Sequence, residues 1–302
     1  MKLVIVGGTG FIGRPLGQWL SAAGHEVVVL TRRSPDHPAG SIRYAPWQPE
    51  APGPWQGELD GAGGVVNLAG EPIVARRWTA EQKRRILESR VASTDAVVTA
   101  LRAVSRKPAV LVNASAVGYY GPRGDALLSE RDGVGGDFLA QVCQRWETAA
   151  QAAERLGVRV VRLRIGLVLA NDGGVLAKML PPFQWGLGGP LGNGQQWMSW
   201  IHRDDLLSLI RWSLEDSRVM GALNATAPNP VTMREFTDTL GCVLHRPSLA
   251  RVPAVVLRLM LGEMAEMVLT GQRVVPEAAL RLGFSFRHPV LRDALLACVS
   301  HT

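Results

Sequence analysis

The sequence has few of the residues on which several common protein functions depend. It contains three cysteines, Cys143, Cys242 and Cys298, and none of them belongs to a CxxC motif. An odd number of isolated cysteines argues against a disulfide framework and against a cysteine-based zinc site. We therefore interpret the thiols as buried or incidental groups of a protein from a reducing compartment.

Long apolar runs are also missing. The most apolar late stretch, residues 252–269, is interrupted by Arg258, Glu263 and Glu266, so we expect no membrane span. An apolar strand that starts at residue 2 leaves no room for a signal peptide. These observations predict a cytoplasmic protein.

Lysine is scarce, with four among the 33 Lys and Arg residues, which outnumber the 26 Asp and Glu residues to give a net charge of +7. The basic residues are scattered rather than grouped, so we expect no nucleic-acid partner. A nucleic-acid-binding protein stays an alternative that rests on charge alone. At 302 residues the chain is long enough for one large α/β domain and a smaller appendage.

The N-terminus carries the most informative pattern of the chain. An apolar strand at residues 1–6 runs into Gly7, Gly10 and Gly13, a helical stretch follows, and residues 27–30 form a second apolar strand. Glycines allow a pyrophosphate to approach the backbone closely, and the N–H groups at the start of the helix then face the anion. Strand, glycine turn, helix and strand in this order predict a dinucleotide-binding site.

Apolar and helical segments alternate along most of the chain, which predicts a doubly wound parallel sheet of the Rossmann type. We expect further strands near residues 42–44, 65–68, 109–114, 158–169 and 222–225, and helices over residues 79–101, 138–156 and 204–215. The predicted dinucleotide-binding domain covers residues 1–170 and is rejoined by about 200–228. Residues 171–199, rich in Gly and Pro, are expected to form a substrate-covering loop, and residues 229–302 a small, largely helical C-terminal domain.

Several motifs together resemble the extended, epimerase-like branch of the short-chain dehydrogenase/reductase superfamily. They are GGTGFIG at residues 7–13, NLAG at 67–70, SAVGYYG at 115–121, RIGLVL at 164–169 and WIHRDD at 200–205. Longer phrases, and the tail from residue 229 onward, resemble a narrower group of uncharacterised activity with a small extra C-terminal domain. The resemblance implies a cofactor site that includes Gly7, Thr9, Gly10, Phe11, Ile12, Gly13, Leu68, Ala69, Gly70, Glu71, Arg164 and Gly166.

The end of the second strand indicates which cofactor is bound. An NAD-binding site of this kind places an acidic residue there to accept a hydrogen bond from the ribose 2′-OH. This sequence has Thr31, Arg32 and Arg33 instead, with no carboxylate before Asp36. Guanidinium groups suit a 2′-phosphate, so we predict NADP, the alternative being two solvated arginines on a loop.

The usual proton donor of the superfamily, a Tyr followed four residues later by Lys, is absent. Each of the three tyrosines, Tyr44, Tyr119 and Tyr120, has a residue other than lysine at that distance. The corresponding helix positions, counted back from Glu147, hold Leu139 and Cys143. The resemblance implies a serine beside the missing pair, and this serine is present as Ser115.

Ser115, Tyr119 and Tyr120 follow a predicted strand at the edge where open α/β sheets bind ligands, so we predict them as catalytic residues. The alternative is that both rings only pack the loop. Lys83 and Arg90, on one face of a helix, are predicted to contact the cofactor, and the alternative for them is a structural or solvated role. Lys178, Trp200 and His202 are the predicted substrate contacts, although core packing of Trp200 and a structural role of His202 are open alternatives.

No second histidine lies within ligand spacing of His202 in the sequence, so we predict no metal. The sequence thus predicts an NADP-binding epimerase or reductase that acts on a small molecule whose identity the residues do not reveal. A catalytically silent NADP(H) sensor is the alternative, because the Tyr/Lys pair is absent.

Overall fold

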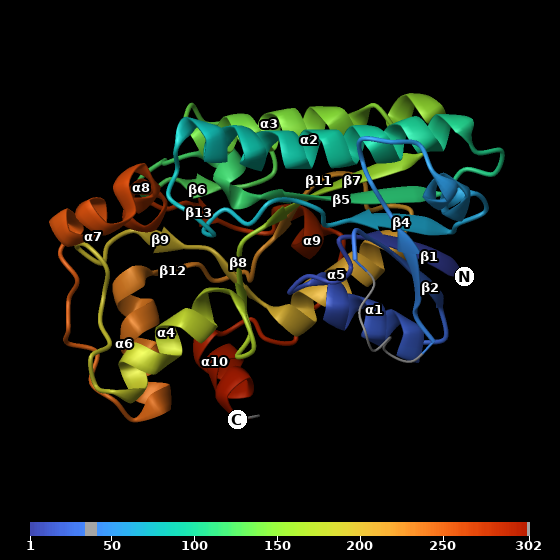
Figure 1. The fold of residues 1–302 in the computed structure, drawn as a ribbon. Helices are drawn as coiled ribbons and strands as arrows, with labels where there is room; N and C mark the ends of the chain where they lie inside the picture. Colours follow the sequence, from blue (N-terminus) through green and yellow to red (C-terminus); the bar gives the residue numbers. More distant parts are fainter. Residues whose placement is uncertain (34–40, 301–302) are drawn as a thin grey trace.

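The computed structural model describes residues 1–33 and 41–300. A seven-stranded sheet in the order β11-β7-β5-β4-β1-β2-β3 forms the centre of the molecule, and all of its pairings are parallel (Figure 1). Its strands are β1 (Lys2–Val6), β2 (Glu26–Thr31), β3 (Arg43–Pro46), β4 (Gly64–Asn67), β5 (Val110–Ala116), β7 (Arg159–Ile165) and β11 (Gly221–Ala225). The predicted doubly wound parallel sheet is confirmed.

Helices cover both faces of this sheet. In Figure 1, α2 (Ala80–Ala103) and α3 (Phe138–Gln151) lie on one face, and α1 (Gly13–Ala22) and α5 (Arg203–Glu215) lie on the other. Strand β1 contributes side chains to the cores on both faces, because successive side chains of a strand point to opposite faces of the sheet. Leu3 and Ile5 join the buried cluster that includes α1 and α5, whereas Val4 and Val6 join the cluster that includes α2.

The order of the strands reverses between β1 and β4. From β1 the sheet continues through β2 and β3 on one side and through β4, β5, β7 and β11 on the other. In open α/β sheets the ligand crevice lies at such a switch point, outside the carboxyl ends of the strands. The ends of β1, β2, β4 and β5 are therefore the places to look for a site.

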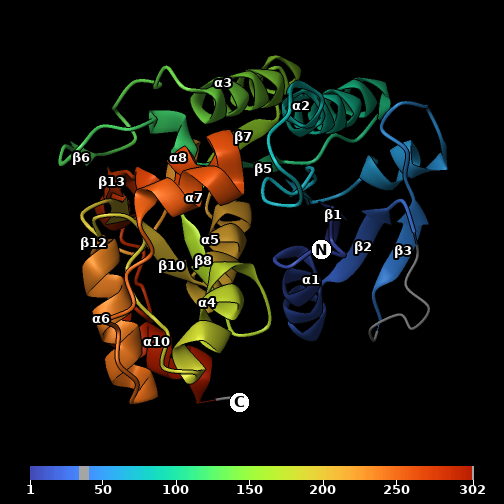
Figure 2. The ribbon, with the colours of Figure 1, turned by 60° about the vertical axis from the view of Figure 1, so that its left-hand side comes forward.

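The rest of the chain builds a largely helical region, part of which packs around a separate buried cluster that includes Leu176, Phe183, Trp200, Phe236 and Leu295. Its helices are α4 (Gly174–Gln184), α6 (Met233–Leu244), α7 (Ala254–Leu261), α8 (Ala265–Leu269), α9 (Glu277–Arg281) and α10 (Leu291–Val299). Short strand pairs complete it: β8 (Leu167–Leu169) with β10 (Trp200–His202), β9 (Trp197–Met198) with β12 (Val231–Thr232), and β6 (Leu127–Leu128) with β13 (Arg273–Val274). Figure 2 shows this region beside the sheet domain.

Two details differ from the sequence-based expectation. Residues 171–199 contain helix α4, which the internal Pro181 and Pro182 obscure in the sequence and which buries Leu176 and Phe183. The single strand expected at residues 158–169 is divided at Gly166, where β7 ends and β8 begins to pair with β10. Among the described residues, no helix is long and apolar enough to cross a membrane.

Candidate functional site

The glycine turn between β1 and α1 combines two glycines required by packing with one that leaves open space. A Cβ at Gly7, where φ is +76°, would lie 2.9 Å from the Ala69 nitrogen, and a Cβ at Gly13 would lie 2.5 Å from the Gly7 oxygen. A Cβ at Gly10 would touch only the Gly7 oxygen, at 3.4 Å. Thr9 and Gly10 are exposed, and α1 begins without a side-chain cap. The exposed turn before α1 is thus shaped to receive a phosphate at the start of the helix.

Phe11 and Ile12 complete the turn and are both partly exposed. The Phe11 ring packs against the backbone before α4, because a Cβ at Gly173 would lie 2.5 Å from it. The Arg203 guanidinium lies 5.7 Å from the centroid of the same ring. The glycine turn is therefore in contact with the segment that leads into α4. A ligand on this turn would have both domains within reach.

At the end of β2 the two arginines are exposed and the backbone is fixed. The Thr31 hydroxyl donates to the Arg33 carbonyl at 2.8 Å and accepts from its N–H at 3.3 Å. Neither Arg32 nor Arg33 forms an ion pair with a residue that the structure describes. Asp36, the first carboxylate after this strand, lies outside the described residues.

The segment after β4 is held in place by buried polar groups. The Leu68 N–H donates to the Val6 carbonyl at 2.9 Å, and the Ala69 N–H donates to the side chain of Asn67 at 3.2 Å. Asn67 is completely buried, and its amide donates to Asn113 at 2.7 Å. Leu68, Ala69 and Gly70 are thus presented at the switch point with a defined backbone conformation.

Arg90 contacts this segment from α2, and its expected contact with the cofactor stays a prediction. Only 8% of the residue is exposed, and its guanidinium donates to the carbonyls of Glu71 at 3.0 Å and Ile86 at 2.9 Å. A Cβ at Gly70 would lie 3.0 Å from the Arg90 Cζ, which explains the glycine by protein packing. Arg90 therefore shapes the loop through its Nη1 atom, which donates to both carbonyls.

Lys83 lies on the neighbouring turn of α2 and reaches the C-terminal region. Its Nζ is 2.9 Å from both carboxylate oxygens of Glu263 and 5.5 Å from the centroid of the Phe138 ring. Nearby, the Arg77 guanidinium donates to the carbonyls of Leu259 and Met260. These contacts join the loop after β4 to α7, and a cofactor contact of Lys83 stays a prediction.

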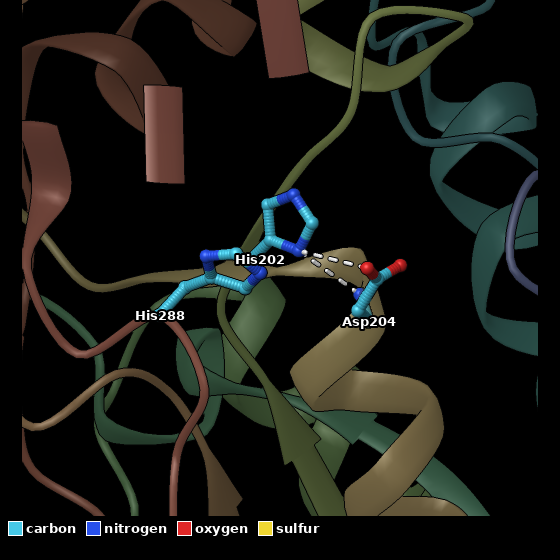
Figure 3. Close-up of side chains that lie close together, drawn as sticks. All are labelled: His202, Asp204 and His288. Atoms are coloured by element: carbon cyan, nitrogen blue, oxygen red, sulfur yellow. Dashed lines mark hydrogen bonds and ion pairs between the residues drawn. The ribbon is translucent and has the colours of Figure 1, made fainter. Parts of the chain in front are cut away.

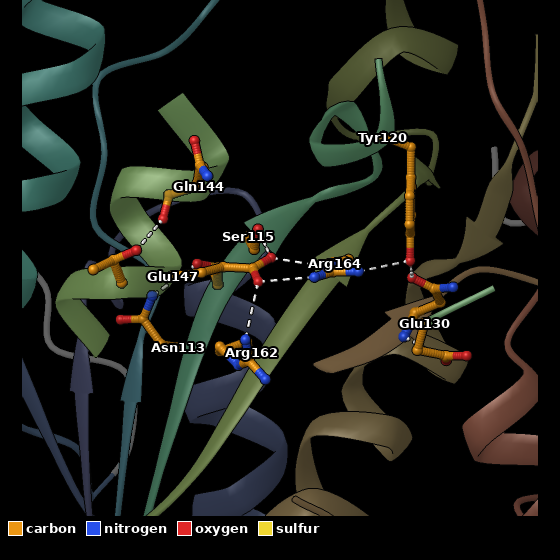
Figure 4. Close-up of polar contacts among 11 residues, drawn as sticks. Asn113, Ser115, Tyr120, Glu130, Gln144, Glu147, Arg162 and Arg164 are labelled. Carbon is orange, nitrogen blue, oxygen red and sulfur yellow. Dashed lines mark hydrogen bonds and ion pairs between the residues drawn. The ribbon is translucent and has the colours of Figure 1, made fainter. Parts of the chain in front are cut away.

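A buried network occupies the end of β5, where catalysis was predicted (Figure 4). The Ser115 hydroxyl donates to Glu147 at 2.8 Å, and the same carboxylate accepts from Arg164 at 2.8 and 3.0 Å. Arg164 also donates to the Tyr120 hydroxyl at 2.9 Å, which in turn donates to Asn224 at 2.7 Å. The network runs continuously from α3 across β5 and β7 to β11.

This network bears on two predicted roles. Arg164 is 2% exposed, and although burial opposes its charge, the hydrogen bonds and charge of Glu147 raise its pKa above the ordinary value, so it is an internal counter-ion, and its cofactor contact stays a prediction. Tyr120 is completely buried, and burial, only partly opposed by Arg164, raises its pKa to about 12. A phenol without access to ligand and with this pKa is a poor proton donor near neutral pH, so Tyr120 is a structural residue.

Tyr119 differs from its neighbour because it is partly exposed. The Arg164 guanidinium lies 3.4 Å from the centroid of its ring, and the two tyrosine rings meet edge to face at 5.4 Å. Cys143, at the position where the family places lysine, is buried, and burial and the nearby Glu147 charge raise its pKa to about 11. Of the three predicted catalytic residues, Tyr119 alone presents a side chain that is not buried.

The predicted substrate residues are not brought together. Trp200 is completely buried, and its indole donates to the Asn229 carbonyl at 3.0 Å, so the expected substrate contact is wrong and the core alternative holds. Lys178 is exposed on α4. His202 is 7% exposed and caps α5 by accepting from the Asp204 N–H at 3.2 Å. Gly166 is explained by protein packing, since a Cβ there would lie 2.4 Å from the Ser199 oxygen.

Comparison with known proteins agrees with the parallel sheet and the glycine turn described above. The model of the NAD-dependent epimerase/dehydratase family matches residues 3–225, and a domain of unknown function, DUF1731, matches residues 252–298. The chain belongs to this epimerase/dehydratase family. The second match covers the segment from α7 to α10, which includes β13.

Full-length relatives share both parts. The chain is 45% identical to the Arabidopsis thaliana chloroplastic homologue of epimerase family protein SDR39U1, over 98% of this chain and 86% of that protein. It is 40% identical to an epimerase family protein of Mycobacterium bovis, Mb2239, over 97% and 96% of the two chains. A crystal structure of human epimerase family protein SDR39U1 with NADPH is 33% identical, with a TM-score of 0.89 and complete coverage of both chains.

Proposed function

We propose that this protein binds NADP(H) and acts as an epimerase or reductase on a small molecule, with an active site that lacks the Tyr/Lys pair. The observation that carries the proposal is the open Gly10 surface next to two exposed arginines, Arg32 and Arg33. The glycine turn offers N–H groups to the pyrophosphate, and the arginines offer charge-assisted donors to a 2′-phosphate. The human relative crystallised with NADPH supports the same choice of cofactor.

The chemistry is proposed to take place at the end of β5. Bound NADP(H) would supply or accept a hydride there. Tyr119 would exchange the proton of the reacting group, because its side chain is partly exposed and the Arg164 cation at its ring face stabilises negative charge. The Ser115 hydroxyl already donates to Glu147, so toward a substrate it would act as an acceptor that orients a hydroxyl group.

A silent NADP(H) sensor is the second candidate. It is favoured by Leu139 and Cys143 at the positions of the missing pair and by the commitment of Ser115 to Glu147. The two candidates separate in an assay of cofactor-linked turnover against a panel of carbonyl compounds and sugar nucleotides. Turnover supports the enzyme, and tight NADPH binding without any turnover supports the sensor.

Titration with NADPH and NADH at one ionic strength tests the cofactor assignment. A charged hydrogen bond contributes about 1.5–3 kcal/mol, so one good contact to the 2′-phosphate gives roughly a ten- to hundredfold preference for NADPH. Arg32→Ala and Arg33→Ala should weaken NADPH binding and leave NADH binding nearly unchanged. Arg155→Ala, an exposed arginine before β7 at the opposite edge of the sheet, is the matched control. Equal dissociation constants for the two cofactors would reject the assignment.

The setting proposed for this activity is the cytoplasm, in agreement with three cysteines that are all free in the structure. The proposed partner is a small molecule, with neither nucleic acid nor membrane. Affinity for DNA that falls steeply with salt would contradict this part of the proposal.

A further inference from the structure

Two histidines far apart in the sequence meet at the start of α5. The ring centroids of His202 and His288 are 4.0 Å apart with an angle of 43° between the planes. Figure 3 shows the two rings next to each other, with the Asp204 carboxylate beside them. No second histidine lies within ligand spacing of His202 in the sequence, but folding brings His288 to it.

Buried Asp205 fixes this arrangement from the first turn of α5. It is 1% exposed, and its two oxygens accept the N–H groups of Arg287 at 2.7 Å and His288 at 2.9 Å. His202 is fixed from the other side, since β10 pairs with β8 and places it opposite Leu169. Both histidine backbones are thus held in place by the fold, independently of their rings.

The side chains of His202, His288 and Asp204 present ligand atoms that all lie within 4.8 Å of one another. The His288 Nε2 atom is buried and has no hydrogen-bond partner among the described residues. A buried polar atom without a partner destabilises the folded state, and in native proteins it often marks a bound water or ion. This atom is directed toward the same small volume as the other two ligands (Figure 3).

We propose that His202, His288 and Asp204 bind a divalent transition metal of the zinc class, with water completing the coordination. Two imidazoles and one carboxylate are typical of zinc sites with an open position and do not suit Mg²⁺ or Ca²⁺, which prefer oxygen ligands. Metal–nitrogen bonds are about 2.0–2.1 Å long, so the three ligand atoms must move closer to a common point. Rotation of the three side chains would bring them there. The metal would replace the hydrogen bond that the Asp204 N–H donates to the His202 Nδ1 at 3.2 Å.

The charges around this site set the expected strength of binding. Arg203 is paired with Asp172. The largely exposed Arg287 lies 3.9 Å from the Asp204 carboxylate, and a bound metal would replace Arg287 as the partner of that carboxylate. Asp205 supplies a second negative charge nearby. Because the site adjoins a helix N-terminus, which disfavours cations, we expect weaker binding than in a structural zinc site of four cysteines.

Binding at this place would connect the two parts of the molecule. Asp204 lies in the first turn of α5, which packs on the sheet, and His202 ends β10 directly before that helix, whereas His288 precedes α10 in the C-terminal region. A ligand that binds only the folded state raises its stability in proportion to the logarithm of ligand concentration. The metal would thus act as a clip that holds the C-terminal segment against α5.

The test uses the untagged full-length protein, treated with a chelator and then titrated with Zn²⁺ alone or Co²⁺ alone. We expect one metal per chain, a rise in Tm of several degrees, and a visible Co²⁺ band of a site with nitrogen ligands. His288→Ala should lower the affinity at least a hundredfold, and Asp204→Asn about tenfold. His245→Asn changes an exposed histidine with a φ of +54°, which asparagine tolerates, and should bind metal like the unaltered protein.

The outcomes that overturn the proposal are equally direct. Absence of saturable binding at one metal per chain rejects it without the need for any variant. Unchanged metal affinity in His288→Ala also rejects it, since metal would then bind elsewhere. Circular dichroism of each variant establishes that a loss of binding comes from a folded chain.

Discussion

The Arg164 guanidinium lies 3.4 Å from the centroid of the Tyr119 ring while it donates hydrogen bonds to Glu147. One buried cation therefore connects the internal carboxylate with the partly exposed tyrosine of the predicted catalytic edge. Its neighbour Tyr120 accepts a hydrogen bond from the same cation and is completely buried. The two tyrosines, adjacent in the sequence, have different environments and should respond differently to substitution.

Tyr119→Phe should lower turnover by about 10²–10⁴-fold once a substrate is known, because it removes the positioned proton donor, while NADPH affinity stays unchanged. Tyr120→Phe should mainly reduce stability, because it removes the hydroxyl that joins Arg164 and Asn224. Steady-state kinetics and thermal unfolding of both variants distinguish the roles. The assignment fails if Tyr120→Phe alone loses turnover.

Gly10→Val should abolish NADPH binding with little effect on folding. The valine side chain would fill the open surface of the turn, where a Cβ meets only the Gly7 oxygen at 3.4 Å. Gly57→Ala is the matched control, since a Cβ there meets no atom within 4 Å. Isothermal titration with NADPH and thermal unfolding measure the two effects, and retained affinity in Gly10→Val would show that the pyrophosphate binds elsewhere.

Glu147→Ala should destabilise the fold by about 3–5 kcal/mol, because it leaves the buried Arg164 cation without its counter-ion. The matched control is Glu263→Ala, which breaks the largely exposed pair with Lys83 and should cost about 0–1 kcal/mol. Urea unfolding of the three proteins provides the comparison. Similar stabilities of the two variants would mean that solvent reaches Arg164.

Thiol labelling should modify one cysteine in the native protein and three after denaturation. Cys242 is exposed, whereas Cys143 and Cys298 are both 4% exposed, and burial is the main cause that raises the pKa of each to about 11. At about pH 8 these two stay protonated, and the thiolate is the reactive form. Labelling with Ellman's reagent measures the count, and Cys242→Ser should leave no rapidly reacting thiol.

Local patterns were sufficient for much of the fold. The strand at residues 2–6, the turn from Gly7 to Gly13 and the helix that follows are adjacent in the chain, so their periodicity and glycine spacing predict them directly. The capping box of Thr232 and Glu235 forms as its spacing predicts. Helix α4 was missed because the proline pair conceals the apolar spacing of Leu176 and Phe183.

The site was less predictable, because its decisive contacts join distant segments. Ser115 meets Glu147, Lys83 meets Glu263 and His202 meets His288, and no local spacing indicates which residues will face each other. Burial was equally hidden: the sequence presents Tyr119 and Tyr120 alike, and only the packing of β11 against β7 shows that Asn224 receives the second hydroxyl. Residue types indicated one edge of the sheet but could not assign the roles along it.

Gly166 fixes how closely the end of β7 approaches the segment before β10. A Cβ at this residue would lie 2.4 Å from the Ser199 oxygen, so any larger side chain would force the two backbones apart. A substitution at this joint would therefore be transmitted as a shift of the C-terminal region against the sheet, whereas a substitution in an exposed loop would be absorbed locally.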